Sequence, residues 1–125
     1  MLAQRVLAIE HDWRIRKLIR ANLEPLGLHV QEAVGGQHGL GLLRDMAPDL
    51  ILLDLDLPDM DATYLLSLLS EQLTQSIPII VMSAEPPDRQ LMQRERAASY
   101  LQKPFSAPTL LQLVQQALNT CPKIL

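Results

Sequence analysis

The chain alternates short apolar runs with longer segments of helical period. Five runs have the length and composition of strands, and they span residues 5–9, 28–33, 50–54, 77–82 and 100–102. The first, third and fourth are almost continuously apolar, which is typical of central parallel strands covered on both faces. The second alternates and the fifth is short and partly polar, so we expect both nearer the edges of a sheet.

The segments between the runs carry apolar residues at helical spacing. Asp12 is the candidate N-cap of the first helix, and Gly27 is a stop signal that follows it. Gly39 and Gly41 fall inside the second helix and weaken it by roughly 1 kcal/mol each relative to alanine. Leucines between residues 65 and 73 predict a third helix.

Two further helices complete the pattern. A short and very polar segment over 86–98 predicts the fourth, and Ser106 caps the fifth, with Pro108 in its first turn. Strands that alternate with helices predict an α/β protein, in which one doubly wound parallel sheet of (βα)5 type has helices on both faces.

Composition narrows the class of protein. The chain has 125 residues, of which 48% are apolar and 20% charged, and its net charge is −3 without a basic stripe. We therefore expect a single domain over 1–125, with its core at about 4–119, that binds neither nucleic acid nor membrane. Cys121 is the one cysteine, and with no apolar span or signal peptide this predicts a cytoplasmic location.

Polar residues collect where the predicted strands end. They are Glu10, His11 and Asp12 after the first run, Asp54 and Asp56 after the third, Ser83 after the fourth and Lys103 after the fifth. Each alone could be a cap, a turn residue or a solvated charge, but the carboxyl ends of parallel strands share one edge. Such a group supports phosphoryl transfer to Asp54, with Ser83 and Lys103 holding phosphoryl oxygens.

Three segments resemble the receiver domain of two-component response regulators of the chemotaxis-regulator type. They are "PDLILLDLDLPDMDA" (48–62), "IPIIVMSA" (77–84) and "YLQKPF" (100–105). The resemblance covers about residues 4–119, with the motifs in family order. It implies a flavodoxin-like fold with strand order 2-1-3-4-5.

The resemblance also implies roles for single residues. Asp54 matches the phosphoacceptor, which would form an aspartyl phosphate, and Ser83 and Lys103 match its catalytic partners. Ser83 and Tyr100 match the pair that switches conformation on activation. Lys103 precedes a cis-type peptide bond to Pro104.

The metal site departs from the family pattern. The resemblance implies that Glu10, Asp54 and Asp56 hold Mg²⁺, Asp56 through its backbone carbonyl. His11 stands where the family has a second acid, and imidazole is a poor ligand for Mg²⁺. We therefore expect weakened Mg²⁺ binding, with His11 or Asp12 as a further ligand. The alternative is that His11 is a partly exposed residue at a strand end with no ligand role.

The loops near the site depart from the pattern as well. Asp56 and Glu85 are expected to face the site, where they could restore negative charge or repel the phosphoryl group. Asp59 and Ala62 stand where the family often has glycine, so we expect a stiffer turn after the third strand.

The leading hypothesis is a phosphorylatable receiver and not an enzyme. Its partners would be a sensor histidine kinase or phosphotransfer protein and a downstream effector protein or fused output domain, and a homodimer is open. One alternative is a pseudo-receiver that acts through phosphorylation-independent contacts. Another is a phosphatase of the haloacid dehalogenase type, which "ILLDLDLP" resembles.

Overall fold

A computed structural model of the chain describes residues 3–72, 77–94 and 97–119. Cys121 lies outside these residues. The elements are, in order, β1 (Arg5–Ile9), α1 (Trp13–Leu23), the 3-10 helix η1 (Glu24–Leu26), β2 (His29–Ala33), α2 (Gly36–Asp45), β3 (Leu50–Asp54), α3 (Ala62–Gln72), β4 (Ile79–Ser83), α4 (Arg89–Arg94), β5 (Ser99–Gln102) and α5 (Ala107–Asn119).

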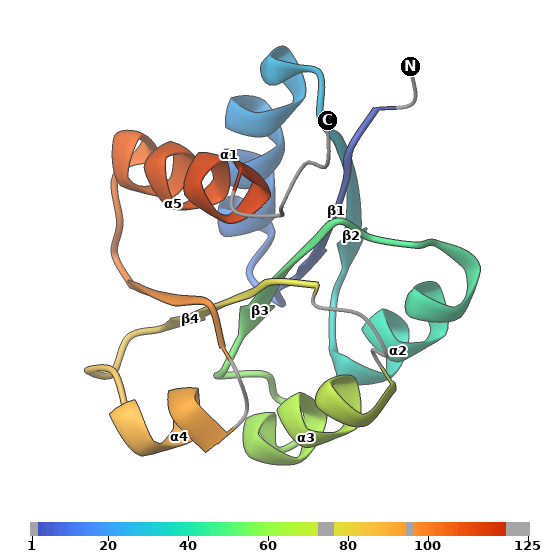
Figure 1. The fold of residues 1–125 in the computed structure, drawn as a ribbon, viewed down its shortest axis with the longest axis vertical. Coiled ribbons are helices and arrows are strands. Elements are labelled where there is room, and N and C mark those ends of the chain that lie inside the picture. The colour runs from blue at the N-terminus through green and yellow to red at the C-terminus, as the bar shows by residue number, and fades with distance from the viewer. Residues whose placement is uncertain (1–2, 73–76, 95–96, 120–125) are drawn as a thin grey trace.

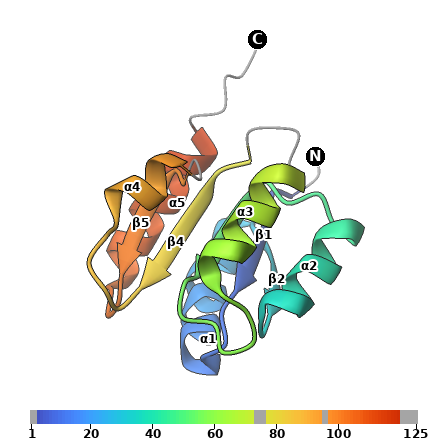
Figure 2. The same cartoon turned by 90° about the horizontal axis from the view of Figure 1, so that it is seen from below.

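The strands form one parallel sheet in the order β2-β1-β3-β4-β5. This confirms the α/β class, the (βα)5 topology and the flavodoxin-like order. Every residue of β3 and β4 is buried, whereas the edge strand β5 is only partly so. Figure 1 shows α1 and α5 on one face of the sheet and α2, α3 and α4 on the other, and Figure 2 gives the view from below. None of the described helices combines the length and apolar character needed to cross a membrane.

Successive residues of a strand belong in turn to two hydrophobic clusters, one on each face of the sheet. Val6 and Ala8 belong to the cluster under α1 and α5, and Leu7 and Ile9 to the cluster under α2 and α3. A central strand covered on both faces leaves no solvated position for a polar side chain. The buried polar residues of the described chain are accordingly found at strand ends, and they are Glu10, Asp54 and Ser83.

Capping residues set the helix ends as the sequence predicts. The Asp12 side chain accepts a hydrogen bond of 2.9 Å from the backbone N–H of the second residue of α1. Pro25 lies in η1, and Gly27 follows with φ 84°, a left-handed conformation that favours glycine. Ser106 Oγ accepts the Thr109 N–H at 3.3 Å.

The fourth helix is shorter than predicted. The expected range was 86–98, but α4 covers only six residues. Its start is fixed by Asp88, whose carboxylate accepts two backbone N–H groups of the first turn. After α4, the Ala98 N–H donates to the Ile79 carbonyl, so the chain has already joined the sheet. Local polarity alone could not reveal this tertiary constraint.

The glycines of α2 give a matched test of packing. A Cβ at position 39 would lie 2.6 Å from Cδ1 of the buried Ile9, and overpacking of this kind destabilises by about 1–3 kcal/mol. A Cβ at position 41 would meet nothing within 4 Å. We therefore expect Gly39→Ala to lower the free energy of unfolding and Gly41→Ala to raise it by about 1 kcal/mol. Urea denaturation measures both, and equal stability of the two variants would contradict the predicted clash.

Candidate functional site

Register brings the candidate residues to one edge of the sheet. Ile9 pairs with Leu53 and Ser83 with Gln102, so the residues that follow these strands emerge together. The backbone hydrogen bonds continue past the strand ends: Glu10 N–H donates to the Ala33 carbonyl and Lys103 N–H to the Ser83 carbonyl. The site therefore rests on backbone that is hydrogen-bonded between neighbouring strands.

Lys103 joins two buried carboxylates. Its Nζ lies 3.0 Å from both carboxylate oxygens of Glu10 and 3.0 Å from Oδ1 of Asp54. Glu10 and Asp54 are completely buried, and the Lys103 side chain is 15% exposed. The peptide bond between Lys103 and Pro104 is cis, as the resemblance implied. One ammonium group thus serves two carboxylates, which leaves the cluster an excess of negative charge when both are ionised.

The two carboxyls differ in their affinity for a proton. Burial, with the nearby charge of Asp54 as a second cause, raises the pKa of Glu10 from 4.5 to about 7. Burial also opposes ionisation of Asp54. However, the Asp56 N–H, at 2.8 Å from Oδ1, and Lys103 outweigh it and lower the pKa of Asp54. Asp54 is therefore the ionised member of the pair near neutral pH.

His11 faces the free side of Asp54. Its Nδ1 lies 3.6 Å from Asp54 Oδ2, and its side chain is 51% exposed. Asp54 Oδ2 is buried and has no hydrogen-bond partner among the residues that the structure describes. Glu10, His11 and Asp54 each offer one ligand atom, and these three atoms lie within 4.8 Å of one another.

The other acidic residues near the site have partners elsewhere. The Asp12 carboxylate caps α1 and pairs with Arg14 at 3.3 Å, so the structure does not bring it into the cluster. The Asp56 carboxylate accepts the Ser83 hydroxyl at 3.3 Å and the Ala84 N–H at 3.3 Å. The Asp56 side chain therefore occupies two donors at the end of β4, the Ser83 hydroxyl and the Ala84 N–H. Its carbonyl as a metal ligand stays a prediction.

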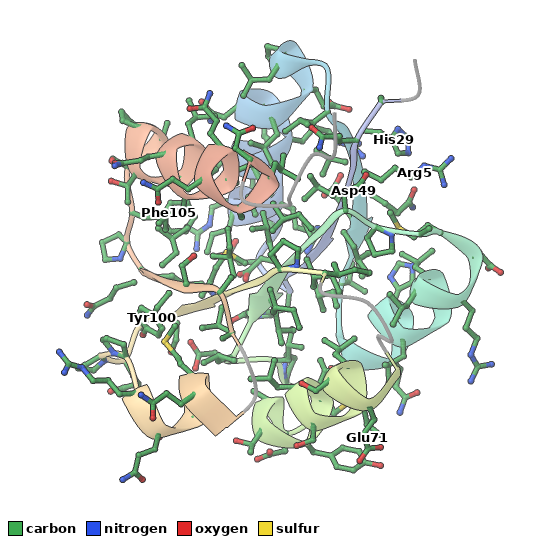
Figure 3. The ribbon with its side chains drawn as sticks, in the orientation of Figure 1. Arg5, His29, Asp49, Glu71, Tyr100 and Phe105 are labelled. Atoms are coloured by element: carbon green, nitrogen blue, oxygen red, sulfur yellow. The ribbon has the colours of Figure 1, made fainter. Side chains whose placement is uncertain are left out.

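Ser83 and Tyr100 are in contact through the backbone. The Tyr100 hydroxyl donates to the Ser83 carbonyl at 3.3 Å, and its ring packs against the cluster under α2 and α3. Figure 3 shows Tyr100 on the side of the sheet that α4 covers. The two predicted switch residues are thus neighbours, while the switch itself stays a prediction.

Two positioning residues were not predicted from the sequence. Arg16 donates through Nη1 to the carbonyls of Glu10 and His11, at 2.8 and 2.9 Å, and its Nε pairs with Glu32. Asp59 accepts the N–H groups of Gly36 and Gln37, at 3.0 and 3.2 Å, and so ties the loop after β3 to the start of α2. The sequence signal for Arg16 was only a charged residue in an amphipathic helix. The signal for Asp59 was an acid at a position where the family often has glycine.

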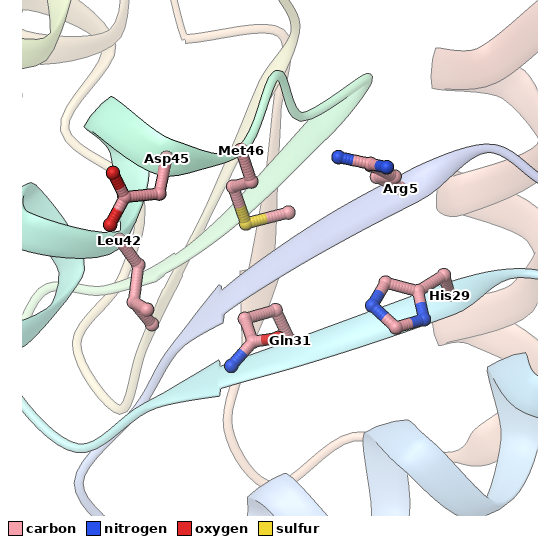
Figure 4. Close-up of a pocket in the computed structure, with 6 residues that line it drawn as sticks. All are labelled: Arg5, His29, Gln31, Leu42, Asp45 and Met46. Carbon is pink, nitrogen blue, oxygen red and sulfur yellow. The ribbon is translucent and has the colours of Figure 1, made fainter.

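One pocket among the described residues lies away from this edge. A cavity of about 260 Å³ opens at the start of β1 and β2 and is lined by Arg5, His29, Gln31, Leu42, Asp45 and Met46 (Figure 4). Those strands reach the cluster at their opposite ends, so the cavity has no contact with Asp54.

Comparison with known proteins identifies the family. Residues 6–115 match the family model described as "Response regulator receiver domain". The chain belongs to the response regulator receiver domain family. This receiver domain is a signalling phosphoacceptor, phosphorylated on aspartate, and the family implies a histidine kinase as partner. The family also accounts for the residues that resembled a dehalogenase-type phosphatase.

Relatives and solved structures agree with the assignment. The receiver domain is 36% identical over 123 residues to the DNA-binding dual master transcriptional regulator RpaA of Synechocystis, covering 96% of this chain and 51% of the relative. It is 37% identical over 116 residues to KdpE of Escherichia coli, covering 91% and 51%. The structure of the chemotaxis response regulator CheY4 of Vibrio cholerae matches with a TM-score of 0.87 and 26% identity, over 94% of this chain and 100% of that one. The receiver domain spans about half the length of these curated regulators.

Receiver domains bind Mg²⁺, and the donors of this one fit such a cation only in part. The Glu10 and Asp54 carboxylates are the oxygen ligands that Mg²⁺ prefers, and Asp54 Oδ2 is buried without a partner. The imidazole of His11 is not a ligand of that kind. The expected weakening of Mg²⁺ binding therefore stays a prediction.

The raised pKa of Glu10 predicts a pH effect on stability. Between its unfolded value near 4.5 and its folded value of about 7, only the folded state keeps the proton. The stabilising contribution of Glu10 is thus complete below this window and is lost as the pH rises through it. The side chain of the Glu10→Gln variant cannot ionise. As the pH rises from about 5 to about 8, the free energy of unfolding should therefore fall less for this variant than for wild type.

Urea denaturation in the presence of a chelator measures this difference. Glu71→Gln is the matched control because Glu71 is exposed on α3 (Figure 3). Parallel stability curves for wild type and Glu10→Gln would contradict the raised pKa.

Proposed function

We propose that this receiver domain accepts a phosphoryl group on Asp54 from a histidine kinase or phosphotransfer protein. One observation supports this most strongly: Asp54 is held ionised by Lys103 and the Asp56 N–H through Oδ1, while Oδ2 is left without a partner. A nucleophile needs a free, ionised oxygen in a fixed position. The ionised carboxylate of Asp54 is fixed in position by these contacts, and its Oδ2 faces the half-exposed His11.

The transfer follows from this arrangement. A carboxylate oxygen of Asp54 attacks phosphorus, and the new O–P bond forms as the N–P bond of the donor phosphohistidine breaks. The electron pair stays on the donor imidazole, which takes up a proton from water. Lys103 neutralises charge that develops near Oδ1. A divalent cation held by Glu10, Asp54 and the Asp56 carbonyl would supply further charge neutralisation when bound.

Ser83 and Ala84 would receive the transferred group. Their hydroxyl and N–H now hold the Asp56 carboxylate, so a phosphoryl oxygen must take its place. Charge-assisted hydrogen bonds of this kind are worth about 1.5–3 kcal/mol, which is enough to shift a two-state equilibrium. We infer that this exchange moves Ser83 and, through its carbonyl, the ring of Tyr100.

The signal would pass to a downstream effector protein or a fused output domain. Relatives that are about twice as long and named as transcriptional regulators support the second route. A kinase of Helicobacter pylori, the sensor histidine kinase CheAY, matches this chain at 31% identity over 119 residues, which cover 91% of this chain and 15% of the kinase. A cytoplasmic location and a homodimer stay predictions.

Asp54→Asn tests the phosphoacceptor. The amide is not a nucleophile, so we expect phosphoramidate with Mg²⁺ to add one phosphoryl group to wild type and none to the variant. Intact-protein mass spectrometry measures the gain. Asp45→Asn is the matched control, since Asp45 is exposed at the far end of the sheet and should label as wild type does. Undiminished labelling of Asp54→Asn would sink the assignment, and an unlabelled wild type would favour the pseudo-receiver.

Tyrosine resonances test the switch. The chain has two tyrosines. We expect the ring signals of Tyr100 to shift on addition of beryllofluoride, while those of Tyr64, which is 59% exposed on α3, serve as the internal reference. Ser83→Ala should abolish the shift, and Asp56→Ala should preserve it because the receiving hydroxyl remains. A Tyr100 signal that does not respond in wild type would refute the coupling.

A further inference from the structure

The cation cluster has one nitrogen and two oxygen donors. Glu10 and Asp54 lie at the buried side, and His11 lies at the solvent side, where an entering ion meets its imidazole first. The His11 backbone is fixed because Arg16 binds the carbonyls of Glu10 and His11. A ligand held in place before the ion arrives binds with less loss of conformational entropy.

The buried oxygen of Asp54 is a second, independent observation that points to a ligand. A buried carboxylate oxygen without a partner is destabilising and is rare in native proteins. Asp54 Oδ2 and His11 Nδ1 lie 3.6 Å apart, which is too long for a hydrogen bond. A cation between these two atoms would satisfy both.

Their separation matches a tetrahedral ion such as Zn²⁺ better than octahedral Mg²⁺. Two donors that each lie about 2.1 Å from a tetrahedral ion are about 3.4 Å apart. Two neighbouring oxygens about 2.1 Å from octahedral Mg²⁺ are only about 3.0 Å apart. The observed 3.6 Å is closer to the wider spacing.

No carboxylate of the described chain replaces the acid that His11 displaces. Asp12 is engaged with Arg14 and the start of α1, and Asp56 with Ser83 and Ala84. Lys103 already neutralises part of the charge of Glu10 and Asp54. The electrostatic gain on binding Mg²⁺, a hard and strongly hydrated ion, is therefore small. A bond to the imidazole nitrogen instead favours first-row transition ions, in the order of the Irving–Williams series.

We propose that Glu10, His11 and Asp54 form a site that selects a divalent first-row transition ion of the cobalt, nickel or zinc class over Mg²⁺. The proposal deepens the proposed function, since the same cluster carries the phosphoacceptor. His11 acts here as a metal ligand and sets the ion with which this receiver domain works.

Direct binding to the metal-free, untagged chain tests the selectivity without any phosphoryl donor. Isothermal titration with Zn²⁺ and Mg²⁺, at one pH above the usual pKa of histidine, should show Zn²⁺ bound at least about tenfold more tightly than Mg²⁺ by wild type. His11→Asp should reverse the preference by weakening Zn²⁺ and strengthening Mg²⁺. Because His11 is half exposed, neither change depends on refolding of the core.

Spectroscopy adds a readout at the site. Trp13 is the single tryptophan, lies two residues after His11 and is 62% exposed, so bound Co²⁺ should quench its fluorescence. His29→Asp is the matched control because His29 starts β2 at the opposite edge of the sheet, and it should behave as wild type does.

Two results would overturn the proposal. One is a wild type that binds Mg²⁺ as tightly as Zn²⁺, and the other is a His11→Asp variant with unchanged Zn²⁺ affinity. Either would leave labelling of Asp54 in the presence of Mg²⁺ intact. Conversely, a failure of that labelling would leave the measured metal affinities as they are, so the two proposals fail separately.

Discussion

The contact of Lys103 with Glu10 and Asp54 is the interaction on which the site depends. Two fully buried carboxylates beside each other repel and lack water, and an unpaired charge in such a place is strongly destabilising. Lys103 resolves this by linking the ends of β1, β3 and β5 through one ammonium group. The two carboxyls nevertheless differ in proton affinity. Asp54 also accepts a backbone N–H and stays ionised, whereas Glu10 holds a proton more readily.

The sheet makes that contact possible. Glu10 and Lys103 are 93 residues apart in the chain, and only parallel strands that end at a common edge bring them together. The same covering of both faces that excludes polar groups from the strand interiors concentrates them at this edge. Fold and site are therefore consequences of a single pattern of apolar runs.

How far the sequence predicts this molecule differs from residue to residue. The apolar runs predict β1 and β3 to the residue, and the convergence of Asp54, Ser83 and Lys103 follows from strand ends alone. The order of the strands came from the family resemblance, since periodicity carries no information about neighbours. The hydrogen-bond partners of the Asp56 side chain could not be predicted from sequence, because Ser83 and Ala84 come from another part of the chain.

The hydrogen bonds from Asp59 to α2 have a consequence for sequence variation. A Cβ at position 35 would lie 2.8 Å from Asp59 Oδ1, so the absence of a side chain on one loop permits an acid on the other. The backbone of Gly35 is extended, with φ −166°, and any residue could adopt it if Asp59 were shorter. Homologues should therefore change positions 35 and 59 together, and an alignment of close relatives should show glycine at the first wherever the second is aspartate.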